Sequence, residues 1–249
     1  AAFADVTYGF YPVFAAINSV PYTEIPLQKD FTLCAEDYCG IHKTVFIANP
    51  NAPTGIALPT CEIEKILRSN PDNVVVVDEA YVDFGAASAM PLIEKYDNLL
   101  VVQTFSKSRG MAGMRIGYAM GNPVLIKYLN DVKYSFNSYT MDQTTLALGA
   151  AAISDRAYFE KTVHKVVETR EWTKKELAKL GFVFGDSKAN FIFASHPEIP
   201  AAELFAALRE ANIIVRYFNK PRIDNYLRIT IGTQEDMEML IKFLKNYKK

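Results

Sequence analysis

Short runs of apolar, mostly β-branched residues alternate with stretches of helical periodicity along the first two thirds of this chain. The apolar runs are residues 45–48, 74–77, 99–102 and 116–120. A helix is predicted to begin at Thr60 and to stop at Asn70, which precedes a proline. Continuous apolar strands separated by helices are typical of a parallel sheet covered on both faces. The sequence therefore predicts an α/β fold with a mostly parallel sheet.

The last third of the chain has a different pattern. One long helix is predicted over residues 155–180, and Gly181 supplies its stop. Thr233, with Asp236 three residues later, is a weaker form of the capping box and predicts a helix start. The other predicted elements are strands at 191–194, 213–216 and 226–231 and a helix at 200–211. We expect a small α+β layer with two helices on one sheet, so that residues 1–152 form a large domain and residues 153–249 a small one.

Composition and charge exclude several classes of function. The chain has 27 Lys and Arg against 28 Asp and Glu, and this near balance argues against a nucleic-acid binder. No apolar run approaches the roughly 18 residues of a bilayer span, so no membrane contact is expected. The three cysteines lack paired spacing, which indicates a reducing compartment such as the cytoplasm. The scattered histidines show no metal-ligand spacing, and no GxSxG, Walker A or GxGxxG motif is present.

Polar residues follow three of the predicted strands at the point where each strand ends. Residues 49–55 follow the first strand, Asp78 follows the second, and residues 103–107, which include Lys107, follow the third. Ligands of open parallel sheets bind beyond the carboxyl ends of the strands, so these residues are expected to meet at one rim. Arg115 follows in a loop with two glycines, and arginine and serine near such a loop suit phosphate.

Each of these residues has a simpler interpretation when it is taken alone. Residues 49–55 are rich in turn formers, and Asp78 is as readily a helix N-cap. Lys107 is as readily a solvated surface lysine, and Tyr8 would ordinarily lie in the core or in a turn. Their occurrence together and in this order favours a functional site.

Several motifs occur in a fixed order along the chain. They are Asn-Ala-Pro-Thr-Gly at 51–55, Asp-Glu-Ala-Tyr at 78–81, Thr-Phe-Ser-Lys at 104–107, and Arg115. In this order they resemble the fold-type I pyridoxal-phosphate aminotransferases. A closer similarity to the histidinol-phosphate branch rests on three further segments, Asp-Val-Thr-Tyr-Gly-Phe-Tyr-Pro at 5–12, Val-Arg-Tyr-Phe-Asn-Lys-Pro-Arg at 215–222 and Leu-Arg-Ile-Thr-Ile-Gly-Thr at 227–233. The resemblance covers essentially the whole chain and implies pyridoxal 5′-phosphate as cofactor and a homodimer.

The resemblance also implies a role for individual residues. The implied catalytic residues are Lys107, which would bond to the cofactor aldehyde, Asp78, which would pair with the pyridine nitrogen, and Tyr81, at the ring hydroxyl. The implied cofactor-binding residues are Tyr8, Asn51, Asp78, Tyr81, Thr104, Ser106, Lys107 and Arg115. The implied substrate-binding residues are Asn190, Arg216 and Arg228.

The chemistry of this cofactor explains the residue types. A carboxylate keeps the ring nitrogen protonated and so deepens the electron sink. A lysine is required because an amine must bond to the aldehyde and, once released, move the proton. Arginine suits phosphate and carboxylate because its planar fork binds either one bidentately. The implied reaction converts L-histidinol phosphate and 2-oxoglutarate to imidazole acetol phosphate and glutamate in histidine biosynthesis.

Two features depart from the pattern of the family. Ala52 stands where asparagine commonly precedes Pro-Thr-Gly, so Asn51 is the candidate for the contact to the ring hydroxyl. The family also has further sequence in front, which supplies a substrate lid and a Gly-Ser-Asp-type segment at the cofactor phosphate. Nothing similar precedes Ala1, and the N-terminal part of the family fold is expected to be missing.

Three alternatives remain open from the sequence. A decarboxylase of a phosphorylated amino acid, such as threonine phosphate, would share the cofactor cradle. A non-catalytic domain of the same fold would bind a ligand or a partner, although an intact Lys107 with Asp78 and Arg115 argues against it. A plain α/β scaffold would make the ordered motifs a coincidence.

Overall fold

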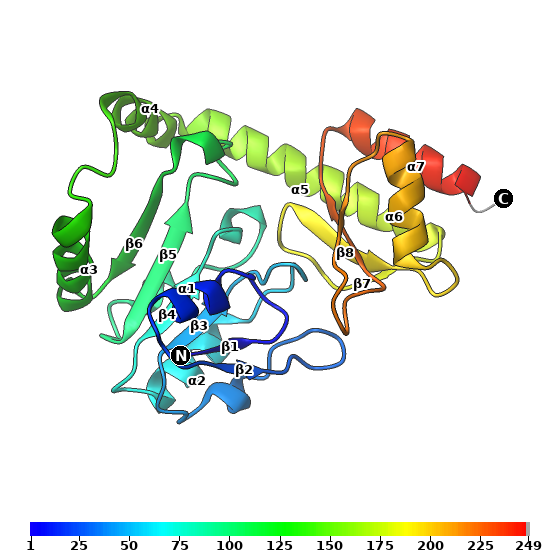
Figure 1. Ribbon diagram of the computed structural model, residues 1–249. Helices are drawn as coiled ribbons and strands as arrows, with labels where there is room; N and C mark the ends of the chain where they lie inside the picture. Colours follow the sequence, from blue (N-terminus) through cyan, green and yellow to red (C-terminus); the bar gives the residue numbers. More distant parts are fainter. Residues whose placement is uncertain (248–249) are drawn as a thin grey trace.

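The computed structural model describes residues 1–247 and builds them around two sheets (Figure 1). The larger sheet has the order β2-β1-β3-β4-β5-β6. Its strands are β1 (Ala2–Ala4), β2 (Thr23–Ile25), β3 (Val45–Ala48), β4 (Val75–Asp78), β5 (Leu99–Thr104) and β6 (Gly117–Gly121). Strands β1 to β5 run parallel, and β6 pairs antiparallel with β5 at the edge. The predicted mostly parallel sheet is confirmed.

The smaller sheet is antiparallel and has the order β7-β8-β10-β9. Its strands are β7 (Val183–Phe184), β8 (Phe191–Ser195), β9 (Arg216–Tyr217) and β10 (Leu227–Thr230). The strand predicted over 213–216 is wrong in its position, because the ladder contains only Arg216 and Tyr217. Ile213 and Val215 still pack against the core of this half, so their alternation reflects burial without ladder hydrogen bonds.

The helices lie before, between and after the strands. They are α1 (Tyr11–Ile17), α2 (Thr60–Ser69), α3 (Pro123–Phe136), α4 (Gln143–Ser154), α5 (Arg156–Lys179), α6 (Ala201–Glu210) and α7 (Gln234–Tyr247). Short 3₁₀ turns are η1 (Ala35–Tyr38), η2 (Val82–Phe84), η3 (Met90–Leu92) and η4 (Ala112–Met114). The predictions of α2, α5, α6 and α7 are confirmed, whereas α1, α3 and α4 were not predicted. Within residues 1–247, no helix has the length and apolar character needed to cross a membrane.

Side-chain caps fix the ends of two predicted helices. Asp155 accepts a hydrogen bond from the Tyr158 backbone N–H at 3.1 Å and begins α5. Gly181, with φ of +84°, follows the end of this helix in the left-handed conformation that favours glycine. At the start of α7, the Thr233 N–H donates to Asp236 and the Asp236 N–H donates to the Thr233 hydroxyl. This reciprocal pair confirms the predicted capping box.

The helices cover the two sheets differently. Helix α2 packs its buried Ile63, Ile66 and Leu67 onto one face of the larger sheet. Helix α1 lies on the opposite face, where the ring of Tyr11 contacts Phe46. The smaller sheet shares one core with α5, α6 and α7, so three helices rather than the predicted two pack against it. The same core leaves out the face of β8 and β10 that carries Phe191, Phe193 and Arg228.

Helix α5 joins the two halves of the molecule. Figure 1 shows it running from α4, beside the larger sheet, to the smaller sheet with α6 and α7. Its 24 residues span about 36 Å at 1.5 Å per residue. Its Arg170 is 2% exposed and donates to Phe84 O at 2.7 Å and to Ala189 O at 3.0 Å, one carbonyl from each half. The domain boundary between residues 152 and 153 stays a prediction and falls inside α4.

Candidate active site

The carboxyl ends of β3, β4 and β5 lie side by side, because Ala48 pairs with Asp78 and Asp78 with Val102. Beyond these ends lies a cavity of about 360 Å³. The predicted site residues that line it are Tyr8, Asp78, Tyr81, Thr104, Ser106, Lys107 and Arg115. The fold thus brings most of the predicted site to one rim, as expected for an open parallel sheet.

Asp78 occupies the end of β4 at this cavity. Its Oδ2 accepts a hydrogen bond from the Tyr11 phenol at 2.9 Å, and its Oδ1 accepts one from the Ala80 N–H at 3.1 Å. Burial raises the pKa of this carboxyl above its usual range, and the two donors and the Lys107 charge only partly offset it. The alternative of a helix N-cap is excluded, because the next turn begins at Val82 and has Tyr81 at its N-cap position.

Tyr11 is a site residue that the sequence analysis missed. Its side chain is buried at the start of α1, and its pKa is raised well above the usual range by burial and by the charge of Asp78. The phenol therefore stays protonated and remains a hydrogen-bond donor to that carboxylate. One signal was available in the sequence. Tyr11 lies three residues after Tyr8, a predicted site residue, and directly before a proline that is typical of the start of a helix.

Lys107 is exposed at the mouth of the cavity. Its Nζ lies 5.2 Å from the ring centroid of Tyr81, and no carboxylate among residues 1–247 forms an ion pair with it. Lys107 also borders a second cavity, of about 410 Å³, which Phe84 and Asn190 help to line. An unpaired amine between two cavities is accessible for covalent bonding to a ligand on one side while the other admits a reactant.

Hydroxyl groups and a guanidinium gather at another part of the first cavity. The Ser106 N–H donates to Thr104 Oγ1 at 3.0 Å, and that hydroxyl donates to Ser106 Oγ at 2.9 Å. Arg115 is exposed, has φ of +56°, and donates from Nη1 to Ala112 O at 3.0 Å. Such a set of donors suits a phosphate group.

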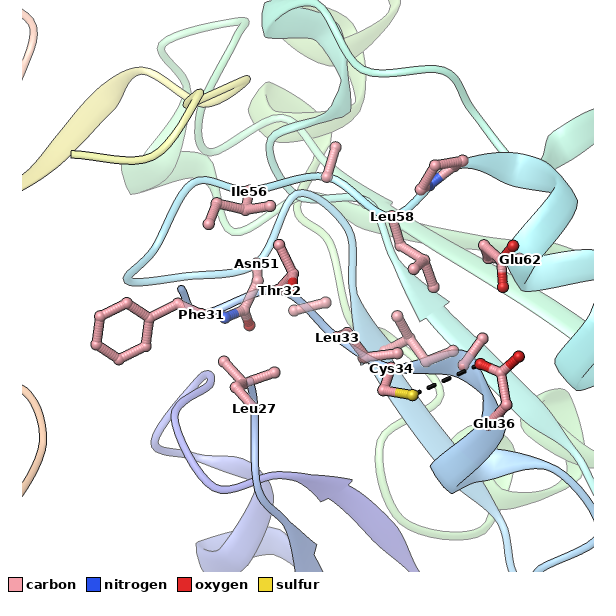
Figure 2. Close-up of a pocket in the computed structure, with 15 residues that line it drawn as sticks. Leu27, Phe31, Thr32, Leu33, Cys34, Glu36, Asn51, Ile56, Leu58 and Glu62 are labelled. Carbon is pink, nitrogen blue, oxygen red and sulfur yellow. Dashed lines mark hydrogen bonds between the residues drawn. The ribbon is translucent and has the colours of Figure 1, made fainter. Parts of the chain in front are cut away.

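Asn51 does not lie in this cavity. Its Oδ1 accepts from the Thr7 hydroxyl at 2.7 Å, and its Nδ2 donates to Val6 O at 2.9 Å and to Thr54 Oγ1 at 3.1 Å. Figure 2 shows Asn51 at a different cavity, together with Leu27 and other mostly apolar side chains. The amide is thus engaged in holding its own turn, and Ala52 takes its place at the wall of the first cavity.

Arg216 and Arg228 lie opposite each other on β9 and β10 of the smaller sheet. Both guanidinium carbons approach the Phe218 ring, at 5.7 Å from Arg216 and 5.9 Å from Arg228. The Nε of Arg228 is buried and has no hydrogen-bond partner among residues 1–247. An unpaired buried donor costs free energy in the folded protein.

One aromatic pair connects these arginines to the cavity. Arg228 lies 5.2 Å from the centroid of Phe191, and this ring contacts Tyr81 edge to face at 5.1 Å. Asn190 precedes Phe191 in the chain, so the two cavities and the arginines share one region between the sheets. Within residues 1–247, no group of three or more His, Cys, Asp and Glu side chains is arranged to hold a metal ion.

Comparisons with known proteins point in one direction. A family model described as aminotransferase class I and II matches residues 1–244. The histidinol-phosphate aminotransferase of Lactococcus lactis subsp. cremoris (strain MG1363) is 51% identical over 98% of this chain, which spans 69% of that protein. The crystal structure of the histidinol-phosphate aminotransferase from Clostridium acetobutylicum has a TM-score of 0.88 at 22% identity, covering 99% of this chain and 77% of that one.

The fold itself is shared more widely. The L-threonine-O-3-phosphate decarboxylase from Porphyromonas gingivalis has a TM-score of 0.80 at 23% identity, over 98% of this chain and 76% of that one. At this identity the likeness concerns the fold alone. Fold similarity therefore cannot separate amino transfer from decarboxylation, whereas sequence identity favours the first.

Proposed function

The chain belongs to the class I and II aminotransferases, and from this membership we propose that it exchanges the amino group of L-histidinol phosphate with 2-oxoglutarate. The products would be imidazole acetol phosphate and glutamate, as part of histidine biosynthesis. The chain is a transaminase, and the cofactor of its family is pyridoxal 5′-phosphate. The choice of substrates is supported by relatives that are named histidinol-phosphate aminotransferases and share 50–51% sequence identity with this chain.

The residues of the first cavity fit this cofactor. When bound, pyridoxal phosphate supplies an electron sink for the substrate. Thr104, Ser106 and Arg115 would bind its phosphate, and the Tyr8 ring would lie against the pyridine. Asp78 would hold the proton on the ring nitrogen.

Lys107 and Tyr81 would act at the other side of the ring. Lys107 would hold the cofactor covalently and, once displaced by the substrate amine, move the proton at the substrate carbon. Tyr81 would donate to the ring hydroxyl. Because the amide of Asn51 is bound within its own turn, we assign this contact to Tyr81 and not to Asn51.

The pairing of Arg228 with Arg216 on adjacent strands, beside the rings of Phe191 and Tyr81, is the observation that carries the substrate assignment. A carboxylate or phosphate on the substrate would bind the guanidinium of Arg228, which is only partly buried, and Arg216 on the adjacent strand would add a second guanidinium. Asn190, at the second cavity with Lys107, would contact the same substrate. One anion site would then serve histidinol phosphate and the dicarboxylate in alternate half-reactions.

We also propose that the protein acts as a homodimer in the cytoplasm. Helix α3 buries none of its residues and exposes Tyr128, Val132 and Phe136, which supports contact with further protein. The three cysteines of the chain are free, which suits a reducing compartment. Light scattering of the purified protein measures the oligomeric state.

An absorbance spectrum of the purified protein loaded with pyridoxal phosphate tests the function. Addition of histidinol phosphate should convert the aldehyde-derived band to that of the amine form, and 2-oxoglutarate should restore it. A parallel assay with threonine phosphate measures release of carbon dioxide. Release of carbon dioxide without amino transfer would identify the decarboxylase, and absence of any spectral change would favour a binding domain without catalysis.

A further inference from the structure

We propose that Arg222 is a positioning residue that fixes the two proposed substrate arginines relative to the cofactor cavity. Arg222 lies in the connection between β9 and β10, so it belongs to the hairpin that carries Arg216 and Arg228. The inference rests on the proposed role of these two arginines. It adds a residue that touches neither substrate nor cofactor and acts through the hairpin.

Arg222 binds four groups of the N-terminal half of the chain with one side chain. Its Nη1 forms an ion pair with Asp5 Oδ2. Its Nη2 donates to Leu27 O at 2.8 Å and to Gln28 O at 3.0 Å. Its guanidinium carbon lies 5.7 Å from the Phe31 ring centroid. Charge-assisted bonds of this kind are stronger than neutral ones and also fix direction.

The partner of this ion pair is itself held in place. Asp5 Oδ1 accepts from the Val6 N–H at 2.8 Å and from the Leu27 N–H at 3.0 Å. The carboxylate therefore connects the end of β1 to the segment after β2 before it meets Arg222. Asp5 lies three residues before Tyr8, so the ion pair acts on the segment that leads directly into the cavity wall.

The backbone at Arg222 indicates that its contacts determine its conformation. Arg222 has φ of +70°, a left-handed value that residues other than glycine and asparagine rarely adopt. Ile223, the next residue, is 5% exposed and packs in one cluster with Val6, Phe31 and Phe193. The polar contacts of Arg222 and the burial of Ile223 together hold the hairpin connection against the N-terminal half.

The position of β9 depends on such a support. This strand has only two ladder residues and lies at the edge of the smaller sheet, where β10 is its sole strand partner within residues 1–247. Short edge strands are held weakly by their own ladder. Loss of Arg222 should leave Arg216 and Arg228 free to shift relative to Lys107, while the cofactor contacts stay intact.

Variants of the pair, with pyridoxal phosphate bound, test the proposal. We expect Arg222→Ala to raise the KM for both histidinol phosphate and 2-oxoglutarate about three- to tenfold, with kcat and cofactor content close to wild type. Asp5→Asn should have a similar effect, and the double variant should be no worse than either single one. Hydrogen exchange of residues 216–230 should accelerate in all three. Arg156→Ala, which removes an exposed helical ion pair with Glu160, is the matched control and should change nothing.

Each outcome decides the proposal. Unchanged KM values in Arg222→Ala, alongside a raised KM in Arg228→Lys, would overturn the role of Arg222 and leave the proposed function standing. A raised KM accompanied by comparable losses of kcat, cofactor content and melting temperature would make Arg222 merely structural and would also overturn it. If the wild-type protein transfers no amino group, the proposed function fails. Hydrogen exchange of residues 216–230 then tests the role of Arg222 by itself, and exchange that is no faster in Arg222→Ala than in the wild type would show that Arg222 does not hold the hairpin.

Discussion

The phenol of Tyr11 donates a 2.9 Å hydrogen bond to the carboxylate of Asp78, across 66 intervening residues of the chain. Burial raises the pKa of Asp78, and this bond works in the opposite direction because it favours the charged form. The pair thus opposes part of the rise in the pKa of Asp78 that burial causes.

Replacing Tyr11 by Phe should shift the acid limb of the pH profile to higher pH. Without the phenol the pKa of Asp78 rises further, so a larger fraction of the carboxyl is protonated at a given acidic pH. We expect kcat/KM to fall about tenfold at the acid end, and less at pH 8, consistent with the loss of one hydrogen bond to a charge. The pH dependence of kcat/KM measures this. Tyr22→Phe is the control, because this ring is exposed and stacks on Phe3. An unshifted limb in Tyr11→Phe would refute the role.

Replacing Asp78 by Asn should abolish most of the turnover without destabilising the fold. The carboxylate would no longer hold the ring nitrogen protonated, whereas the removal of a charge disfavoured by burial costs no stability. We expect kcat to drop by about two orders of magnitude or more, with the melting temperature unchanged or slightly raised. Single-turnover kinetics and thermal unfolding measure the two effects. Normal turnover with a lowered melting temperature would show that Asp78 is a structural residue.

Replacing Lys107 by Ala should prevent covalent attachment of the cofactor and amino transfer. Lys107 is the lysine that borders both cavities, and its amine is unpaired among the described residues. Borohydride reduction followed by peptide mapping should label Lys107 in the wild-type protein and nothing in the variant. Lys127→Ala, on the exposed face of α3, should be labelled as the wild type is. A label on another lysine would contradict the assignment.

Replacing Arg228 by Lys should weaken both substrates together. Lysine keeps the charge but lacks the planar fork, so bidentate binding of phosphate and carboxylate is lost alike. Loss of one charge-assisted hydrogen bond costs about 1.5–3 kcal/mol, or about ten- to a hundredfold in KM. Steady-state kinetics of both half-reactions is the measurement, with cofactor content as the control. An effect on one substrate alone would make Arg216 the better candidate for the shared anion site.

Replacing Asp236 by Asn should lower stability at neutral pH only. The Thr233 N–H and hydroxyl hold the pKa of Asp236 below its usual value. The Asp236 carboxylate therefore contributes to the free energy of unfolding at pH values above its usual pKa, and this contribution is lost as the pH falls through the lowered pKa. Urea unfolding should therefore show a smaller free energy of unfolding for the variant at pH 7, and the difference should vanish in strong acid. Asp224→Asn, in an exposed loop, is the control. A difference that persists in strong acid would mean that the charge of Asp236 is not involved.

The elements that could be predicted are those whose burial leaves a periodic pattern. Strand β3 was predicted at its observed residues because it is apolar on both faces, and α2 because Ile63, Ile66 and Leu67 recur on one side. Strands β1 and β2 have three residues each, which is too short for a period. Helix α3 carries an apolar stripe of Tyr128, Val132 and Phe136, spaced four residues apart, but the stripe is exposed, so it does not pack on the core that the pattern would suggest.

The site was predictable where it depends on strand ends and not where it depends on the direction of a side chain. Asp78 and Lys107 reach the cavity because they follow adjacent parallel strands. Asn51 follows the first of these strands as well, but the backbone of its turn directs the amide to Val6 and Thr7. The bond of Arg222 to Asp5 joins residues 217 positions apart, and no local pattern encodes such a contact.

The buried guanidinium of Arg170 couples the unfolding of the two halves. It is bound to the carbonyl of Phe84 on one side and of Ala189 on the other, and its Nε pairs with Glu171, so unfolding of either half removes one of the two carbonyl contacts. Leaving a buried donor without its hydrogen-bond partner costs about 1–3 kcal/mol. Partly folded states are disfavoured by that amount, and the two sheets should melt in a single cooperative transition despite their separate cores.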